Sequence, residues 1–175
     1  ADGPARAALT PGEEMTFRQT GPDGVLAWVG AGPKGRPWLT EQTELGPVRV
    51  PAGGFFQVNP AVAGRMISHV SAILQGLRPA GAIDLYCGAG LFGLVAARLG
   101  LEPVAGADSD ARAIQAAKWN ARELGLHRVE FRADRAGAGL AGFLEKMTPA
   151  KTVLIVDPPR SGMEPDVCRR AAAAG

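Results

Sequence analysis

The chain has 175 residues, 46% of them hydrophobic, and a formal net charge of only +2. This length fits one domain, or a small domain with part of a second. No apolar run approaches the roughly 18 residues of a membrane span, so we expect no membrane partner. Cys87 and Cys168 form no CxxC pair, which favours a reduced, cytoplasmic protein without a structural metal. His69 and His127 stand alone in the sequence, and this excludes a paired-histidine metal motif.

The first 50 residues alternate apolar with polar or small residues and are interrupted by proline and glycine. EMTFRQT and VLAWVGA flank the turn signal GPDG and predict a β-hairpin. PWLTEQTEL and PVRVPAGGFFQV continue in the same extended style. We expect residues 1–50 to be a β-rich segment, the end of a central domain. Residues 51–175 would then form a second domain.

Helices and strands alternate from Asn59 onward. Asn59 is a favourable N-cap, Pro60 is a favourable first helical residue, and apolar residues then recur every three or four positions up to Leu77. Strands are predicted over 82–86, 103–107, 128–132 and 152–156, and helices over 91–99, 110–124 and 138–147. Gly100 and Gly125 lie where helix C-caps belong. This alternation predicts a parallel sheet with helices on both faces.

The last predicted strand, Val153–Val156, is wholly apolar and would lie at or near a sheet edge. A strand of this composition normally has neighbours on both sides. The chain stops at RRAAAAG, within or just after a helix. We therefore expect a domain that is incomplete at its C-terminus; the alternative is a naturally short fold completed by a partner.

Each of the four predicted strands ends in an acidic residue: Asp84, Asp108, Asp134 and Asp157. Ligands of open α/β sheets bind outside the carboxyl ends of the strands. Four carboxylates there would repel a pyrophosphate and favour a ligand with positive charge and hydrogen-bond donors. S-adenosylmethionine has a sulfonium, an ammonium, a ribose diol and an adenine amine. The sequence therefore predicts this methyl donor as the cofactor.

A glycine-rich segment, GAGLFG, follows the first of these strands. It matches GxGxxG, and Asp108 follows at the distance of the ribose-binding acid in the dinucleotide fingerprint. The additional acids argue against NAD. For the methyl donor, Gly88 and Gly90 would let the backbone approach the amino-acid tail. Asp108 could accept both ribose hydroxyls and Asp134 the adenine amine; the alternative is that these acids cap helices.

Several segments together resemble the RNA 5-methyluridine methyltransferases, which act on uracil C5 in tRNA or ribosomal RNA. The matching segments are FFQVNP (55–60), DLYCGAGLFGL (84–94), GADSDARAIQAAKWNARELGL (106–126) and DPPRSGM (157–163). The resemblance implies an α/β, Rossmann-like class I methyltransferase sheet of about four parallel strands, preceded by the β-rich segment. It also implies S-adenosylmethionine as cofactor and RNA as partner.

The resemblance assigns residues to the cofactor site by position. Gln57, Tyr86, Asp108 and Asp157 correspond to cofactor-site residues of the family. Asp108 is a departure, since the family usually carries Glu there. The full set of predicted cofactor-binding residues is Gln57, Tyr86, Gly88, Gly90, Asp108, Asp134 and Asp157.

The catalytic groups of the family have no counterpart in this chain. Uracil C5 is a poor nucleophile, so these enzymes add a Cys thiolate to C6, and a carboxylate base later removes the C5 proton. The family's Cys lies in an SCNP-like motif on the strand after DPPR. Cys87 and Cys168 match neither position. We expect the nucleophile and base beyond Gly175, no catalytic residue in these 175 residues, and no uracil methylation by this chain alone.

Two other functions remain open. Asp-Pro-Pro also resembles the motif of amino-methyltransferases of RNA or DNA bases, although Arg160 stands where those enzymes usually carry an aromatic residue. The third possibility is a non-catalytic module that holds the cofactor and RNA. The sequence predicts neither the particular RNA nor an oligomeric state.

Overall fold

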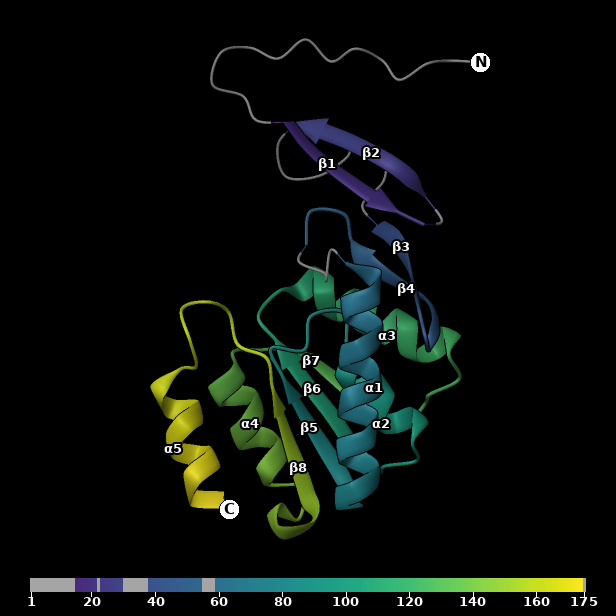
Figure 1. Cartoon of the computed structure of the whole chain (residues 1–175). Coiled ribbons are helices and arrows are strands. Elements are labelled where there is room, and N and C mark those ends of the chain that lie inside the picture. Colours follow the sequence, from purple (N-terminus) through teal and green to yellow (C-terminus); the bar gives the residue numbers. More distant parts are fainter. Residues whose placement is uncertain (1–14, 22, 30–37, 55–58, 175) are drawn as a thin grey trace, which may run out of the picture.

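The computed structural model describes residues 15–21, 23–29, 38–54 and 59–174, and its two antiparallel hairpins precede an α/β unit (Figure 1). The hairpin strands are β1 (Met15–Thr20), β2 (Gly24–Val29), β3 (Trp38–Thr43) and β4 (Gly46–Pro51). The strands of the parallel sheet are β5 (Gly81–Leu85), β6 (Val104–Asp108), β7 (Val129–Ala133) and β8 (Thr152–Val156). The helices are α1 (Pro60–Leu77), α2 (Leu91–Arg98), α3 (Ala111–Glu123), α4 (Ala136–Leu144) and α5 (Pro165–Ala174), with a 3-10 turn, η1 (Pro149–Lys151).

The two hairpins confirm the predicted extended structure for residues 15–20, 24–29, 38–43 and 46–51; the predicted FFQV part lies outside the described residues. β1 pairs with β2, with Thr20 opposite Gly24, and β3 pairs with β4. A partly buried ion pair connects the hairpins: Arg18 Nη2 of β1 lies 3.1 Å from Glu41 Oε1 of β3. Burial raises the pKa of Glu41 above its ordinary value, although the hydrogen bond from Arg18 opposes this shift.

The parallel sheet has the strand order β7-β6-β5-β8, as expected for alternating strands and helices. Ala82 of β5 is in register with Val104 on one side and Val153 on the other. The predicted boundaries of the sheet strands and of α2 and α3 agree with the observed ones to within one residue, whereas α4 begins two residues and ends three residues earlier than the predicted helix 138–147. Among the described residues β8 has a single neighbouring strand, which confirms its predicted place at the edge.

Local signals at the helix ends act as predicted. The Asn59 side chain accepts hydrogen bonds from the first-turn amides of α1 at 3.0 and 3.3 Å, and Pro60 is the first residue of that helix. Gly100 and Gly125 follow α2 and α3 with φ of 84° and 69°. This left-handed backbone is the conformation in which glycine commonly ends a helix.

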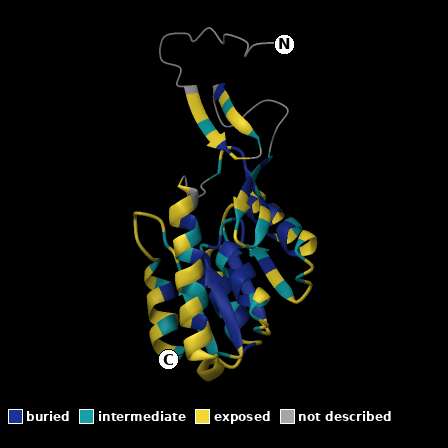
Figure 2. Cartoon of the chain, turned by 45° about the vertical axis from the view of Figure 1, so that its right-hand side comes forward, coloured by how far each residue is buried: buried dark blue, intermediate teal, exposed yellow. Residues whose placement is uncertain are grey.

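Helices cover both faces of the sheet, as predicted, and the centre is buried (Figures 1 and 2). α1 and α2 pack on one face together with the β3–β4 hairpin; α4 and α5 pack on the other. Leu39 of β3 and Val50 of β4 belong to the same apolar cluster as Ala82 of β5 and Val95 of α2. The hairpin therefore shares a core with the sheet, while the domain boundary near residue 50 stays a prediction.

Helix α4 lies unusually close to the sheet. A Cβ atom on Gly139 would lie 2.5 Å from the Cβ of Ala107 in β6. Gly137 and Gly142 belong to the same nine-residue helix. The missing side chain at Gly139 therefore allows direct contact between α4 and β6. None of the helices in the described ranges combines the length and apolar composition that a membrane span requires.

We predict that Leu39→Ala lowers the free energy of unfolding by about 2–5 kcal/mol, the usual cost of such a cavity. Leu39 is only 1% exposed in a cluster that also holds sheet residues. Leu77→Ala is the matched control, because Leu77 is 63% exposed, and we expect a change within about 0.5 kcal/mol. Urea titration followed by circular dichroism measures both. Equal stabilities would show that the hairpin does not share the core.

Candidate functional site

The loop that connects β5 to α2 bends through several left-handed residues. Tyr86, Gly88 and Gly90 have φ of 60°, 52° and 86°. The N–H of Gly90 donates to the carbonyl of Cys87 at 2.8 Å, which closes a tight turn. A left-handed conformation is ordinary for glycine but strained for tyrosine. The surrounding structure must therefore hold Tyr86 in this conformation.

Asp108, at the end of β6, holds this loop. Its Oδ2 accepts the N–H of Gly88 at 2.8 Å, and its Oδ1 accepts the N–H of Asp110 at 2.9 Å. A carboxylate offers about four lone-pair sites, so each oxygen can still accept one more donor. Asp108 can therefore fix the loop and bind a ligand at the same time.

Asp84, near the end of β5, is fully buried. Its Oδ2 accepts the N–H of Gly93 at 2.8 Å, while its Oδ1 has no hydrogen-bond partner among the described residues. Burial raises the pKa of Asp84 to about 7; the hydrogen bond from Gly93 opposes the shift, and the charges of Asp157 and Asp108 add to it. A buried acceptor without a partner is an unsatisfied group that a ligand or a water molecule can complete.

The two predicted glycines of the loop, Gly88 and Gly90, differ in the space that a side chain would find. A Cβ on Gly90 would lie 2.7 Å from the ring of Phe131 and 2.9 Å from Ala117. A Cβ on Gly88 would meet no heavy atom within 4 Å apart from its chain neighbours. Packing therefore requires glycine at position 90, whereas Gly88 faces open space.

Asp134 and Asp157 directly follow the two outer strands, β7 and β8, at the same edge of the sheet. The N–H of Asp134 donates to the carbonyl of Asp108 at 2.9 Å, so the ends of β6 and β7 are adjacent. The side chain of Asp134 accepts the N–H of Arg135, at the start of α4. In the described ranges, no group of three or more His, Cys, Asp and Glu side chains is arranged to hold a metal ion.

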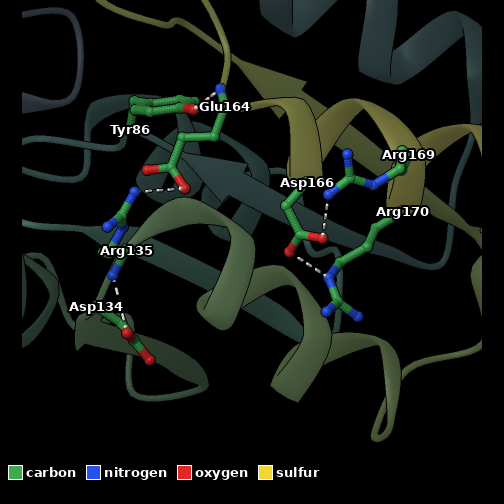
Figure 3. Close-up of polar contacts among 7 residues, drawn as sticks. All are labelled: Tyr86, Asp134, Arg135, Glu164, Asp166, Arg169 and Arg170. Atoms are coloured by element: carbon green, nitrogen blue, oxygen red, sulfur yellow. Dashed lines mark hydrogen bonds and ion pairs between the residues drawn. The ribbon is translucent and has the colours of Figure 1, made fainter.

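Tyr86 connects the loop between β5 and α2 to the segment after β8. Its hydroxyl accepts the N–H of Glu164 at 3.1 Å, and the carboxylate of Glu164 lies 3.5 Å from Arg135 Nη2 (Figure 3). The DPPR segment that precedes Glu164 is thereby held beside the loop. Of the predicted residues, Gln57 lies outside the described ranges.

Neither cysteine is placed as an activated thiolate. Cys87 is buried within the loop, and this burial, together with the charges of Asp84 and Asp108, raises the pKa of its thiol. A thiol with a raised pKa stays protonated and is a poor nucleophile. Cys168 is exposed on α5.

Two residues that shape the loop were missed by sequence reasoning. Phe131 of β7 underlies Gly90, and Asn120 of α3 donates from Nδ2 to the carbonyl of Ala89 at 3.1 Å. A signal for Asn120 was present: it lies on the same helical face as Ala113, Ala116 and Ala117, all of them buried. A polar residue on an apolar face calls for a buried partner.

Comparison with known proteins agrees with this geometry. A family described as "Methyltransferase domain" matches residues 80–153. The chain is 35% identical over 144 residues to the 23S rRNA (uracil(747)-C(5))-methyltransferase RlmC of Shewanella amazonensis. The matched region covers 79% of this chain and 37% of that relative. It is 36% identical over 138 residues to an uncharacterized RNA methyltransferase of Streptomyces coelicolor, covering 73% and 27%.

Solved structures give the same result. The tRNA (uracil-54, C5)-methyltransferase of Pyrococcus abyssi, in complex with S-adenosyl-L-homocysteine, superposes with a TM-score of 0.60 at 26% identity, over 83% of this chain and 32% of that one. A putative O-methyltransferase from Klebsiella pneumoniae shares the fold, with a TM-score of 0.56 at 18% identity over 71% of this chain and 54% of that one.

The fold and these matches define the chain as a class I, S-adenosylmethionine-dependent methyltransferase domain. Within that class it is related to the uracil-C5 methyltransferases of ribosomal RNA and tRNA. The chain spans about a third of the length of these relatives, between 27% and 37%.

We predict that Asp84→Asn removes a pH-dependent loss of stability. Above about pH 4 the unfolded chain ionises Asp84, whereas the folded chain keeps this proton up to about pH 7. Wild-type stability therefore falls across this window through this group and is constant above it. The free energy of unfolding of Asp84→Asn, relative to wild type, should rise by about 2–4 kcal/mol between pH 4 and 8.

Urea titrations at several pH values measure this difference. Glu145→Gln removes a carboxylate from the exposed end of α4, and its profile should run parallel to that of wild type. A constant difference between Asp84→Asn and wild type would mean that Asp84 ionises normally in the folded chain.

Proposed function

We propose that this chain is the cofactor-binding part of an RNA methyltransferase that transfers a methyl group to C5 of a uridine in ribosomal RNA or tRNA. The observation that carries this proposal is the group of acidic residues at one edge of the sheet, in which Asp108, Asp134 and Asp157 surround the buried Asp84 and Asp108 is anchored on the glycine loop. The related rRNA and tRNA enzymes support the reaction and the substrate class. We place the enzyme in the cytoplasm, where free thiols such as Cys87 and Cys168 persist.

The residues of the site fit S-adenosylmethionine. Asp108 has lone pairs left for the two ribose hydroxyls, and Asp134 is the proposed acceptor for the adenine amine. The open space at Gly88 leaves room for the amino-acid tail, and the unpartnered Oδ1 of Asp84 is an acceptor nearby. When bound, the cofactor supplies an electrophilic methyl group on its sulfonium.

The remaining predicted residues would face the substrate side of the cofactor. Tyr86 holds the segment after β8 through Glu164, and Asp157 begins that segment. We assign Tyr86 and Asp157 to the boundary between cofactor and target base. Gln57 is assigned to the same site from its sequence position alone.

This chain would not supply the nucleophile. Uracil C5 attacks a methyl group only after addition of a nucleophile to the ring, which requires an activated group such as a thiolate. Cys87 is buried with a raised pKa, and Cys168 lies on the exposed side of α5. The cysteine and the base that the reaction needs would therefore come from residues outside these 175.

Asp108→Ala should weaken binding of S-adenosylhomocysteine about tenfold or more, because a hydrogen bond to a charged group is worth about 1.5–3 kcal/mol. Isothermal titration calorimetry measures the dissociation constant. Glu123→Ala, an exposed carboxylate on α3, is the control and should change the constant less than about twofold. Unchanged binding by Asp108→Ala would place the cofactor elsewhere.

The chain alone should form no 5-methyluridine when incubated with unmodified RNA and tritiated S-adenosylmethionine, although it binds the cofactor. Nucleoside analysis of the RNA measures the product. Efficient formation of 5-methyluridine would refute the assignment of the nucleophile to residues outside the chain. An N-methylated base would instead favour an amino-methyltransferase that uses the DPPR segment.

A further inference from the structure

Asn120 of α3 is fully buried and uses its whole amide. Its Oδ1 accepts the N–H of Arg49 at 2.7 Å, and its Nδ2 donates to the carbonyl of Arg49 at 2.9 Å and to that of Ala89 at 3.1 Å. Arg49 lies on strand β4 of the β3–β4 hairpin. Ala89 lies between Gly88 and Gly90 in the loop that joins β5 to α2, the proposed cofactor loop. One side chain thus joins three separate parts of the chain.

The contact with Arg49 imitates a strand pair. Arg49 faces Thr40 across the β3–β4 hairpin, and its N–H and carbonyl both bond to Asn120 on the other edge. A side-chain amide presents one acceptor and one donor side by side, as a backbone does in a sheet. Asn120 therefore fixes β4 at two points, in one register.

The contact with Ala89 fixes the cofactor loop. Gly88 and Gly90 both have left-handed φ and restrict the backbone little by themselves. Holding the carbonyl of Ala89 orients the two peptides on either side of it. The same loop places the N–H of Gly88 on Asp108.

Neighbouring contacts support the same junction. The guanidinium of Arg49 lies over the ring of Trp119 at 3.6 Å, a cation–π contact formed by side chains alone. Ala89 also belongs to the apolar cluster that contains Val48 and Val50 of β4. The hairpin and the cofactor loop therefore form one packed unit.

We propose that Asn120 is a positioning residue through which strand β4 sets the conformation of the cofactor loop and hence the affinity for the cofactor. This inference rests on the proposed function, since it takes the loop at Gly88–Gly90 to bind S-adenosylmethionine. Because coupling between two sites is reciprocal, cofactor binding also tightens the contact of the loop with β4. Any movement of the hairpin is then transmitted to the cofactor.

The first test needs no variant. Hydrogen exchange of the wild-type chain is followed with and without saturating S-adenosylhomocysteine. The amides of Gly88 and Arg49 should both exchange more slowly in the presence of the ligand, because Asn120 connects them. The amide of Leu45, bonded to Thr43 within the hairpin turn, is the internal control and should not change. Protection of Gly88 without protection of Arg49 would overturn the proposal.

The second test removes the amide. Asn120→Leu keeps a similar volume. Asn120→Asp keeps the acceptor for the N–H of Arg49 and loses the donor to the carbonyls of both Arg49 and Ala89. Both should bind S-adenosylhomocysteine about tenfold more weakly by calorimetry, at a temperature where circular dichroism shows the native fold. The Gly88 amide of each variant should also exchange faster than in wild type without ligand. Wild-type affinity in a folded variant would contradict the proposed role.

Arg49→Ala is the matched control. It removes the stacking on Trp119 but keeps the backbone groups that Asn120 binds, so we expect a change in affinity of less than about twofold. A tenfold loss in Arg49→Ala would mean that general docking of the hairpin, not Asn120, sets the affinity. Failure of the wild-type chain to bind S-adenosylhomocysteine would instead overturn the proposed function, and the exchange rates of Gly88 without ligand would still test the role of Asn120.

Discussion

The aromatic ring of Phe131 is the constraint on which the rest of the site depends. It fills the space where side chains of Gly90 and Gly106 would lie, with contacts of 2.7 and 2.8 Å to a Cβ at either position. Because Gly90 and Gly106 have no side chains, the loop after β5 can pack directly against the sheet. That close approach brings the backbone amides within reach of the carboxylates of Asp84 and Asp108.

The carboxyl groups at this edge of the sheet differ in their burial and in their hydrogen bonds. Asp108 is held by two backbone amides and is still open to further donors. Asp84 is buried so deeply that the protonated form persists to about pH 7. This edge of the sheet therefore has exposed acidic residues with a neutral acid, Asp84, beneath them. The neutral acid limits the electrostatic repulsion between acids placed so close together.

Most strands and helices could be predicted from the sequence, because hydrophobic periods, helix caps and turns depend on residues that are close together in the chain. The sequence placed Gly88 and Asp108 in one glycine-rich fingerprint, but the hydrogen bond that joins them is seen only in the structure. The contacts of Asn120 with Arg49, and of Tyr86 with Glu164, join residues 71 and 78 positions apart. No local pattern encodes such distances, so these tertiary contacts could be found only in the folded chain.

Helix α4 is stable only because it packs against the sheet. Three glycines within nine residues, at positions 137, 139 and 142, each cost about 1 kcal/mol of helix propensity relative to alanine. A segment this short and this rich in glycine would be a coil as a free peptide. The helical conformation of α4 therefore depends on its packing against β6, and a change that displaces this strand should unwind the helix as well.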